Sequence, residues 1–224
     1  FPLKREKVVR KNFLLNLFFT LIALGLVAQS LPIHARDDAY RLVQLEHGIS
    51  IEIPAHWTVL QDDTRKNLAA SSQAMLENAG IDEGVTGQKK GLLAANATPS
   101  PTGAMIRVSV TTPPDFTQSD LAKATTSELK EVEQELINLF RRMEASGGPS
   151  IVKMLPVKIE PFNNQRAMVI RYIRKSPNGP SHWQVTQYKI PTKNRLVELT
   201  LSSRQSDAVV WNPILERVKR SIVF

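Results

Sequence analysis

The chain has 224 residues, of which 29 are Lys or Arg, 21 are Asp or Glu and none is Cys, so its formal net charge is +8. This length suits one large domain or two small ones. Without cysteine the chain can form no disulfide, no thiolate zinc or iron–sulfur site and no cysteine nucleophile. The positive charge indicates a nucleic-acid-binding protein only if it gathers in the folded part of the chain.

The first 35 residues have the composition of a signal peptide. A basic start with five Lys or Arg and one Glu precedes the apolar run 13–27, which is 15 residues long. Because a membrane-spanning helix needs about 20 apolar residues, this run suits the core of a secretory signal better than a permanent span. We expect cleavage near Ala35, with Ala28 as the second choice, and a mature chain in the periplasm or outside the cell. The alternative is an uncleaved leader that anchors the protein in the membrane.

The leader changes the meaning of the charge. It carries a net charge of +4, and residues 36–224 hold 24 basic and 20 acidic residues, which is also +4. A mild excess spread over the whole mature chain is not the footprint of a nucleic-acid-binding domain. We therefore expect no nucleic-acid partner, and a single domain over 36–224.

The first half of the mature chain mixes strand patterns with one helix. Apolar and polar residues alternate, or run extended, at 40–45, 49–54, 57–60 and 105–110, which indicates strands. Asp62 and Asp63 can cap a helix over 64–78. Five Gly and two Pro favour a loop over 80–103, with a short strand at 92–95 inside it.

The second half predicts one long helix, four strands and a last helix. Apolar residues three or four apart indicate a helix over 119–145, capped by Thr117 or Ser119. The four strand patterns are separated by turns of hairpin length, so they should form an antiparallel meander of 152–161, 167–174, 183–190 and 196–203. Ser206 and Asp207 open the last helix, in which Pro213 causes a kink or sets the start at Asn212.

This order of elements predicts an α+β fold. Several strand positions on the second face of the sheet are also apolar or aromatic, which indicates that both faces are covered. We therefore expect a three-layer α/β/α sandwich around a mainly antiparallel sheet.

Segment 48–57, a strand followed by Pro54 and Trp57, resembles the opening of the Mog1/PsbP-like domains. The long helix before a meander, the segment 194–203 and a last helix containing Trp211 are similar to the same family, so the resemblance covers about 40–224. It implies an antiparallel sheet between helices. Family members act mainly as non-enzymatic binding or assembly proteins, some on a small GTPase in the nucleus, some on photosystem II, and many in the bacterial envelope without a clear role. The family has no common catalytic motif, so the resemblance carries over no catalytic residue.

Catalytic and metal-binding motifs do not emerge from the sequence. His47, His56 and His182 form no His-x-His or His-x-x-x-His pair, so we expect no metal and no cofactor. The Gly-rich segment 84–91 fails as a phosphate loop, because Gln88 stands where Lys is required. A triad built from His56 or His182 with a distant Asp and Ser would be visible only in three dimensions.

Other polar groups have structural explanations or indicate binding. Glu128, Glu131 and Glu135 are typical of a solvated helix face. Large aromatic residues belong mostly to the core, but some lie near arginines in the sequence and could form a binding face: Trp57, Arg171, Tyr172, Arg174, Trp183 and Tyr188.

These observations favour an exported envelope protein of the periplasm that binds another envelope protein or a small ligand without catalysis. The alternative is a periplasmic hydrolase whose site is assembled only in three dimensions.

Overall fold

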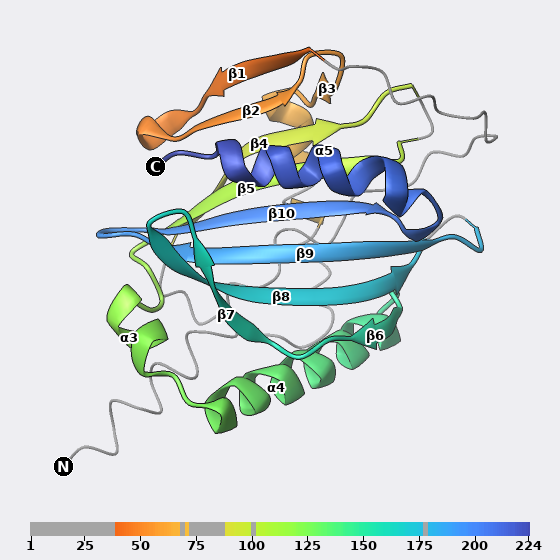
Figure 1. Cartoon of the computed structure of the whole chain (residues 1–224). Coiled ribbons are helices and arrows are strands. Elements are labelled where there is room, and N and C mark those ends of the chain that lie inside the picture. Colours follow the sequence, from red (N-terminus) through yellow and green to blue (C-terminus); the bar gives the residue numbers. More distant parts are fainter. Residues whose placement is uncertain (1–38, 68–69, 72–87, 100–101, 177–178) are drawn as a thin grey trace.

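The computed structural model describes residues 39–67, 70–71, 88–99, 102–176 and 179–224 (Figure 1). The expected signal peptide, its cleavage sites and residues 80–87 of the expected loop lie outside this part of the chain. No helix among the described residues has the length and apolar character needed to cross a membrane.

Most strands form one antiparallel sheet. Its strand order is β3 (Thr58–Val59), β4 (Gln88–Asn96), β5 (Ala104–Thr112), β10 (Leu196–Arg204), β9 (His182–Pro191) and β8 (Gln165–Lys175). The outer edge of β8 pairs with two short strands, β6 (Ile151–Met154) and β7 (Lys158–Phe162). The predicted antiparallel meander is confirmed.

Two strand predictions need correction. The strand expected over 152–161 is divided into β6 and β7 around Pro156, since proline has no N–H to give to a strand ladder. The short strand expected at 92–95 is part of the nine-residue strand β4, so the expected loop over 80–103 is wrong for residues 88–91 and for Asn96. Gly91 lies at a register shift between β4 and β5, so the glycine that indicated a loop marks a β-bulge instead.

One side of the sheet is covered by a strand pair and the last helix. β1 (Tyr40–Gln44) and β2 (Ser50–Pro54) pair with each other as a separate two-stranded sheet, and α5 (Ala208–Ser221) packs beside β2. Figure 1 shows α5 crossing in front of the large sheet, with β1 and β2 above it. α5 begins before Asn212 and passes through Pro213.

The other side carries α3 (Gln118–Lys123) and α4 (Thr126–Ala145). The single helix expected over 119–145 is wrong, because the chain turns at Ala124 and Thr125. Thr125 accepts a hydrogen bond from the Glu128 backbone N–H while Glu128 accepts one from the Thr125 N–H, which is a capping box that starts a new helix. Thr117 caps α3 in the same way, as the sequence predicted.

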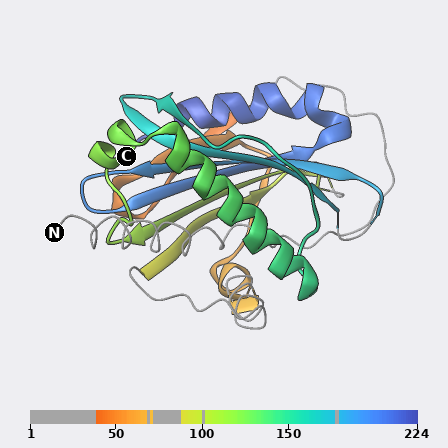
Figure 2. The ribbon, with the colours of Figure 1, turned by 90° about the horizontal axis from the view of Figure 1, so that it is seen from below.

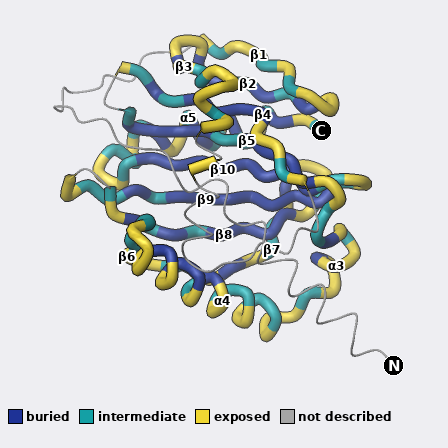
Figure 3. The backbone as a smooth tube through the Cα atoms, turned by 180° about the vertical axis from the view of Figure 1, so that it is seen from behind, coloured by how far each residue is buried: buried dark blue, intermediate teal, exposed yellow. Residues whose placement is uncertain are grey.

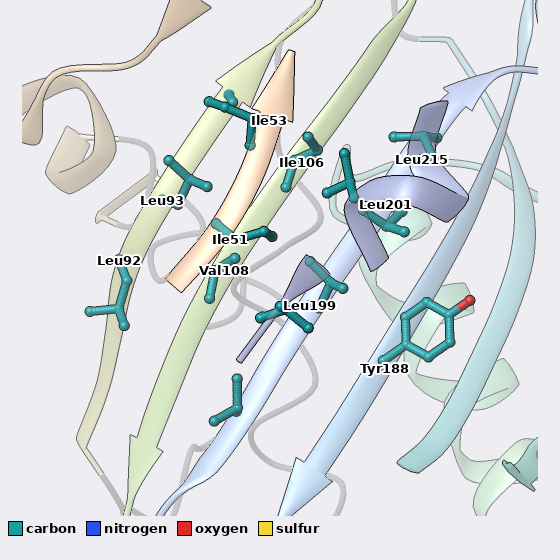
Figure 4. Close-up of a cluster of buried hydrophobic side chains, with 14 of the residues drawn as sticks. Ile51, Ile53, Leu92, Leu93, Ile106, Val108, Tyr188, Leu199, Leu201 and Leu215 are labelled. Atoms are coloured by element: carbon teal, nitrogen blue, oxygen red, sulfur yellow. The ribbon is translucent and has the colours of Figure 1, made fainter. Parts of the chain in front are cut away.

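The three-layer α/β/α arrangement is confirmed: α5 lies on one side of the sheet and α4 on the other (Figure 2). The first core lies between β1–β2, α5 and the sheet, where Ile51 and Ile53 face Val108 and Leu199 (Figure 4). The second core joins α3 and α4 to β8 and β9 through side chains such as Phe140 and Ile170. The described helical residues 62–67 lie on the α4 side in Figure 2, with mainly exposed side chains.

Candidate functional site

The structure divides the expected binding-face residues between the two sides of the sheet. Tyr172 packs against Phe140 of α4, with 5.1 Å between the ring centroids. Arg174 lies opposite Trp183 on the neighbouring strand, and its guanidinium is 5.5 Å from the centre of the Trp183 ring. These three residues, Tyr172, Arg174 and Trp183, therefore share the α4 side.

The remaining three residues lie on the α5 side. Trp57 is buried in the first core, where its ring meets Trp211 edge-on at 5.8 Å. Arg171 donates to both carboxylate oxygens of Glu160, at 2.8 and 2.7 Å. This hydrogen-bonded pair lowers the pKa of Glu160. Tyr188 also interacts with Arg171, and burial raises the pKa of Tyr188. The α5 side thus holds Arg171 in an ion pair near the end of the first core.

The registers place a different set of polar side chains on the α4 side of β4, β5, β10, β9 and β8. Figure 3 shows the backbone of the chain from behind, coloured by burial. Side chains directly opposite each other on paired strands share one side of a sheet. The registers place Arg107 opposite Thr200, Ser109 opposite Glu198, and Glu198 opposite Lys189. We call this set the polar face: Lys89, Arg107, Ser109, Thr111, Arg174, Gln187, Lys189, Glu198, Thr200 and Ser202.

Glu198 is the acid at the centre of the polar face, and two lysines share it. Lys89 Nζ lies 2.8 Å from both carboxylate oxygens, and Lys189 Nζ lies 3.0 Å from Oε1. Burial alone raises the pKa of Glu198, but the charges and hydrogen bonds of Lys189 and Lys89 outweigh it and hold the pKa below 4.5. Glu198 is therefore ionised at neutral pH, which suits a fixed charge and not a general acid or base.

Arg107 lies beside this cluster and is held by neutral groups. Its guanidinium donates to the carbonyl oxygens of Ala95 and Ile106 and to Asn96 Oδ1, and contacts Met105 Sδ. Burial of the guanidinium lowers the pKa of Arg107 to about 10, and the charge of Arg174 lowers it further. At neutral pH Arg107 is therefore a cation without an ion-pair partner among the described residues.

Arg174 is a second cation of the same kind. It is 5% exposed, and its contacts are the Trp183 ring and the carbonyl oxygen of Lys175 at 3.4 Å. Burial lowers the pKa of Arg174 as well, although interaction with Tyr172 opposes the shift. Arg174 also has no carboxylate within ion-pair distance in the described chain.

Three buried hydroxyl groups complete the polar face. The side-chain oxygens of Ser109, Thr111 and Thr200 have no hydrogen-bond partner among the described residues. A buried hydroxyl without a partner costs about 1–3 kcal/mol. Such groups are unusual enough in a native fold to indicate a place where a ligand or solvent completes the bonding.

The candidates for metal binding and catalysis are placed apart from this face. His47 and His56 are exposed, and His182 is half-buried at the start of β9. The described residues contain no group of three His, Cys, Asp or Glu side chains placed to hold a metal ion. Glu128 caps α4, whereas Glu131 and Glu135 are exposed on the same helix.

Sequence reasoning missed the ion cluster of the polar face, although a signal was present. Lys189 and Glu198 are single charges inside apolar strand patterns on either side of a short turn. The turn pairs Pro191 with Leu196, and the same register brings Lys189 opposite Glu198. Opposite charges equally distant from a hairpin turn could therefore have revealed the pair.

No family model matches the chain, and no curated protein matches its sequence. Among solved structures, it is similar to cyanobacterial PsbP (CyanoP) of Synechocystis sp. PCC 6803, with 11% identity, a TM-score of 0.49 and coverage of 87% of this chain and 97% of that one. It is similar to LpqN of Mycobacterium tuberculosis, which is involved in cell envelope biogenesis. The identity is 12%, the TM-score is 0.41, and the match covers 84% of this chain and 93% of that one. It is also similar to the Ran-binding protein Mog1p of Saccharomyces cerevisiae, with 10% identity, a TM-score of 0.38 and coverage of 84% of this chain and 96% of that one. PsbP and Mog1p give the family of the sequence resemblance its name, and the likeness is one of fold.

Proposed function

We propose that this chain is an exported envelope protein that binds another envelope protein or a small ligand in the periplasm and catalyses no reaction. The proposal includes a leader cleaved near Ala35 and a single domain over 36–224. Its binding site is the polar face together with Tyr172 and Trp183, which lie on the same side of the sheet. Most of these side chains are buried, so the site suits a small ligand or a single inserted group of a partner protein.

One observation carries the proposal: Arg107 and Arg174 are fixed on sheet strands without an acid partner in the described chain. A cation held on a strand by its own neighbours needs little ordering when an anionic group arrives, so binding is not weakened by side-chain entropy. The acid of this face, Glu198, is held ionised by two lysines. These are properties of a recognition surface, since acid–base catalysis needs a pKa near the working pH.

Two experiments test the proposal. Expression of the chain with its leader in a bacterial host should give a periplasmic product whose N-terminal sequence begins near Arg36. An uncut product in the membrane fraction would instead support the anchored alternative.

The binding part is tested by affinity capture from envelope extract. The wild-type chain and Arg220→Gln, which changes an exposed arginine, should retain the same partner, and Arg107→Gln should lose it. Turnover of an ester, phosphate ester or glycoside by the purified chain, abolished in His182→Ala, would contradict the proposal and favour the hydrolase.

A further inference from the structure

One edge of the large sheet has a backbone that is only partly paired. β3 pairs with no more than the last two residues of β4, and a final hydrogen bond joins the Leu60 N–H to the Ala94 carbonyl oxygen at 2.8 Å. The chain then leaves the edge as the helical residues 62–67. Within the described chain, residues 88–93 therefore have β5 along one edge and no strand along the other (Figure 1).

The start of β4 exposes this edge to solvent. Gln88, Lys90 and Gly91 are exposed, and Lys89 is half-buried. Gly91 has no side chain, so its exposed surface is that of its backbone, and a Cβ atom placed on it would meet nothing within 4 Å. Alternate N–H and C=O groups of an edge strand point away from the sheet and can pair with another chain. We call residues 88–91 the open edge.

Two lysines give the open edge its charge. Lys89 turns to the α4 side, where it is bound to Glu198, whereas Lys90 turns to the α5 side and is 58% exposed. Lys90 Nζ lies 2.7 Å from Glu46 in the turn η1 (Glu46–Gly48), and the Glu46 side chain is equally exposed. Such an exposed ion pair contributes little stability, so the carboxylate of a partner can join it or replace it.

This charge decides which strand fits the open edge. Opposite charges placed across from each other on paired strands are stabilising, whereas like charges are destabilising. Pairing of two copies of this chain through their open edges would bring the lysines of both copies together. A strand that places an acidic side chain across from Lys90 meets no such opposition.

We propose that the open edge binds an extended acidic segment of a partner protein, which adds a strand to the sheet in line with β3. In this mode of recognition main-chain hydrogen bonds give the affinity and side chains give the specificity. The β-bulge that follows Gly91 limits the added strand to residues 88–91. The proposal goes beyond the proposed function, because its binding groups are the backbone of β4 and Lys90, neither of which belongs to the polar face.

The test is fluorescence anisotropy of a fluorescein-labelled hexapeptide in which glutamate and valine alternate, titrated with the purified chain at constant ionic strength. We expect saturable binding of one peptide per chain and weaker binding of the hexapeptide in which lysine replaces glutamate. The glutamate peptide N-methylated at every amide keeps its charge but has no N–H to donate, so it should not bind. Equal binding of the N-methylated peptide would overturn the addition of a strand.

A charge reversal on the open edge tests the preference for acidic segments. Lys90→Glu should weaken binding of the glutamate peptide by about threefold or more and strengthen binding of the lysine peptide. Lys158→Glu is the matched control, because Lys158 is an exposed lysine on β7, which pairs at the other end of the sheet. This control should bind as the wild type does. Equal weakening in the two variants would reveal a general effect of charge and overturn the site.

Amide hydrogen exchange, measured by mass spectrometry, locates the bound peptide. Exchange slowed over the open edge by the glutamate peptide supports the proposal, and slowing confined to other segments would overturn it. Sedimentation of the chain alone tests the second copy: a dimer in which exchange is slowed at the open edge would replace the acidic partner. Absence of peptide binding to the folded wild type would also overturn the proposal, but it leaves export and binding at the polar face unaffected.

Discussion

Lys189 and Glu198 lie directly opposite each other on β9 and β10, and Lys189 Nζ donates to Glu198 Oε1 at 3.0 Å with both side chains fully buried. A buried ion pair gains little net stability over an apolar pair of similar size, but the removal of one partner is costly. The stability of the fold therefore depends on Glu198, the acid that Lys89 and Lys189 share.

Replacement of that acid should be strongly destabilising. We expect Glu198→Gln to lower the free energy of unfolding by about 3–5 kcal/mol, because the amide removes the charge that both lysines share. Urea unfolding followed by circular dichroism measures the change. Glu52→Gln is the control: Glu52 forms an exposed pair with Arg217 at 3.4 Å, which should contribute less than about 1 kcal/mol. Similar losses in both variants would contradict the assignment.

The same carboxylate predicts acid sensitivity. Its pKa is lower in the folded chain than the ordinary 4.5, so the unfolded chain binds the proton more readily. The stabilisation is therefore fully present above pH 4.5 and is lost as the pH falls through the folded pKa. Unfolding free energies at about pH 7 and about pH 3 should differ less in Glu198→Gln than in the wild type. An unchanged difference would show that other carboxylates, such as Glu160, cause the acid sensitivity.

Gly103 should be intolerant of any side chain. A Cβ atom at this position would lie 2.7 Å from Nε1 of Trp211, whose ring is fixed in the first core against Trp57. Gly103→Ala should cost about 1–3 kcal/mol through overpacking and should change tryptophan fluorescence. Gly91→Ala is the control, since a Cβ there meets no atom within 4 Å. A neutral Gly103→Ala would mean that the indole can move aside.

The break between α3 and α4 depends on one threonine side chain. Thr125→Ala removes the oxygen that accepts the Glu128 N–H, so it should cost about 1 kcal/mol. Thr126→Ala changes an exposed threonine one residue later and should have a smaller effect. Thermal unfolding measures the loss of stability in each variant. Equal losses would show that the hydroxyl of Thr125 does not cap α4.

The sheet could be predicted because its strands alternate regularly and its turns are short. Residues 167–174, 183–190 and 196–203 lie within β8, β9 and β10 as expected. The break in the long helix was missed because Ala124 and Thr125 do not interrupt an apolar pattern carried by residues such as Leu121 and Leu129. It becomes visible only when Thr125 is recognised as a cap.

The polar face could not be predicted by the same reasoning. A lysine or glutamate at every second position ordinarily marks the solvent side of a strand. Lys189 and Glu198 follow this pattern but are buried, because the register of several strands brings opposite charges together. Strand periodicity shows which residues share a side, and the hairpin register could have paired Lys189 with Glu198, but only the strand order brings Lys89 of β4 to the same acid.

The end of the described chain has a consequence for how the protein is made. Val223 exchanges two backbone hydrogen bonds with Ser50, each 2.9 Å long, so the strand pair β1–β2 is joined to residues far along the chain. Ile51 and Ile53 likewise bury their side chains in the core that contains α5. Contacts between such distant residues slow folding. The strand pair β1–β2 therefore has no complete partner until α5 and Val223 have been synthesised, so this domain can finish folding only after that segment has left the ribosome.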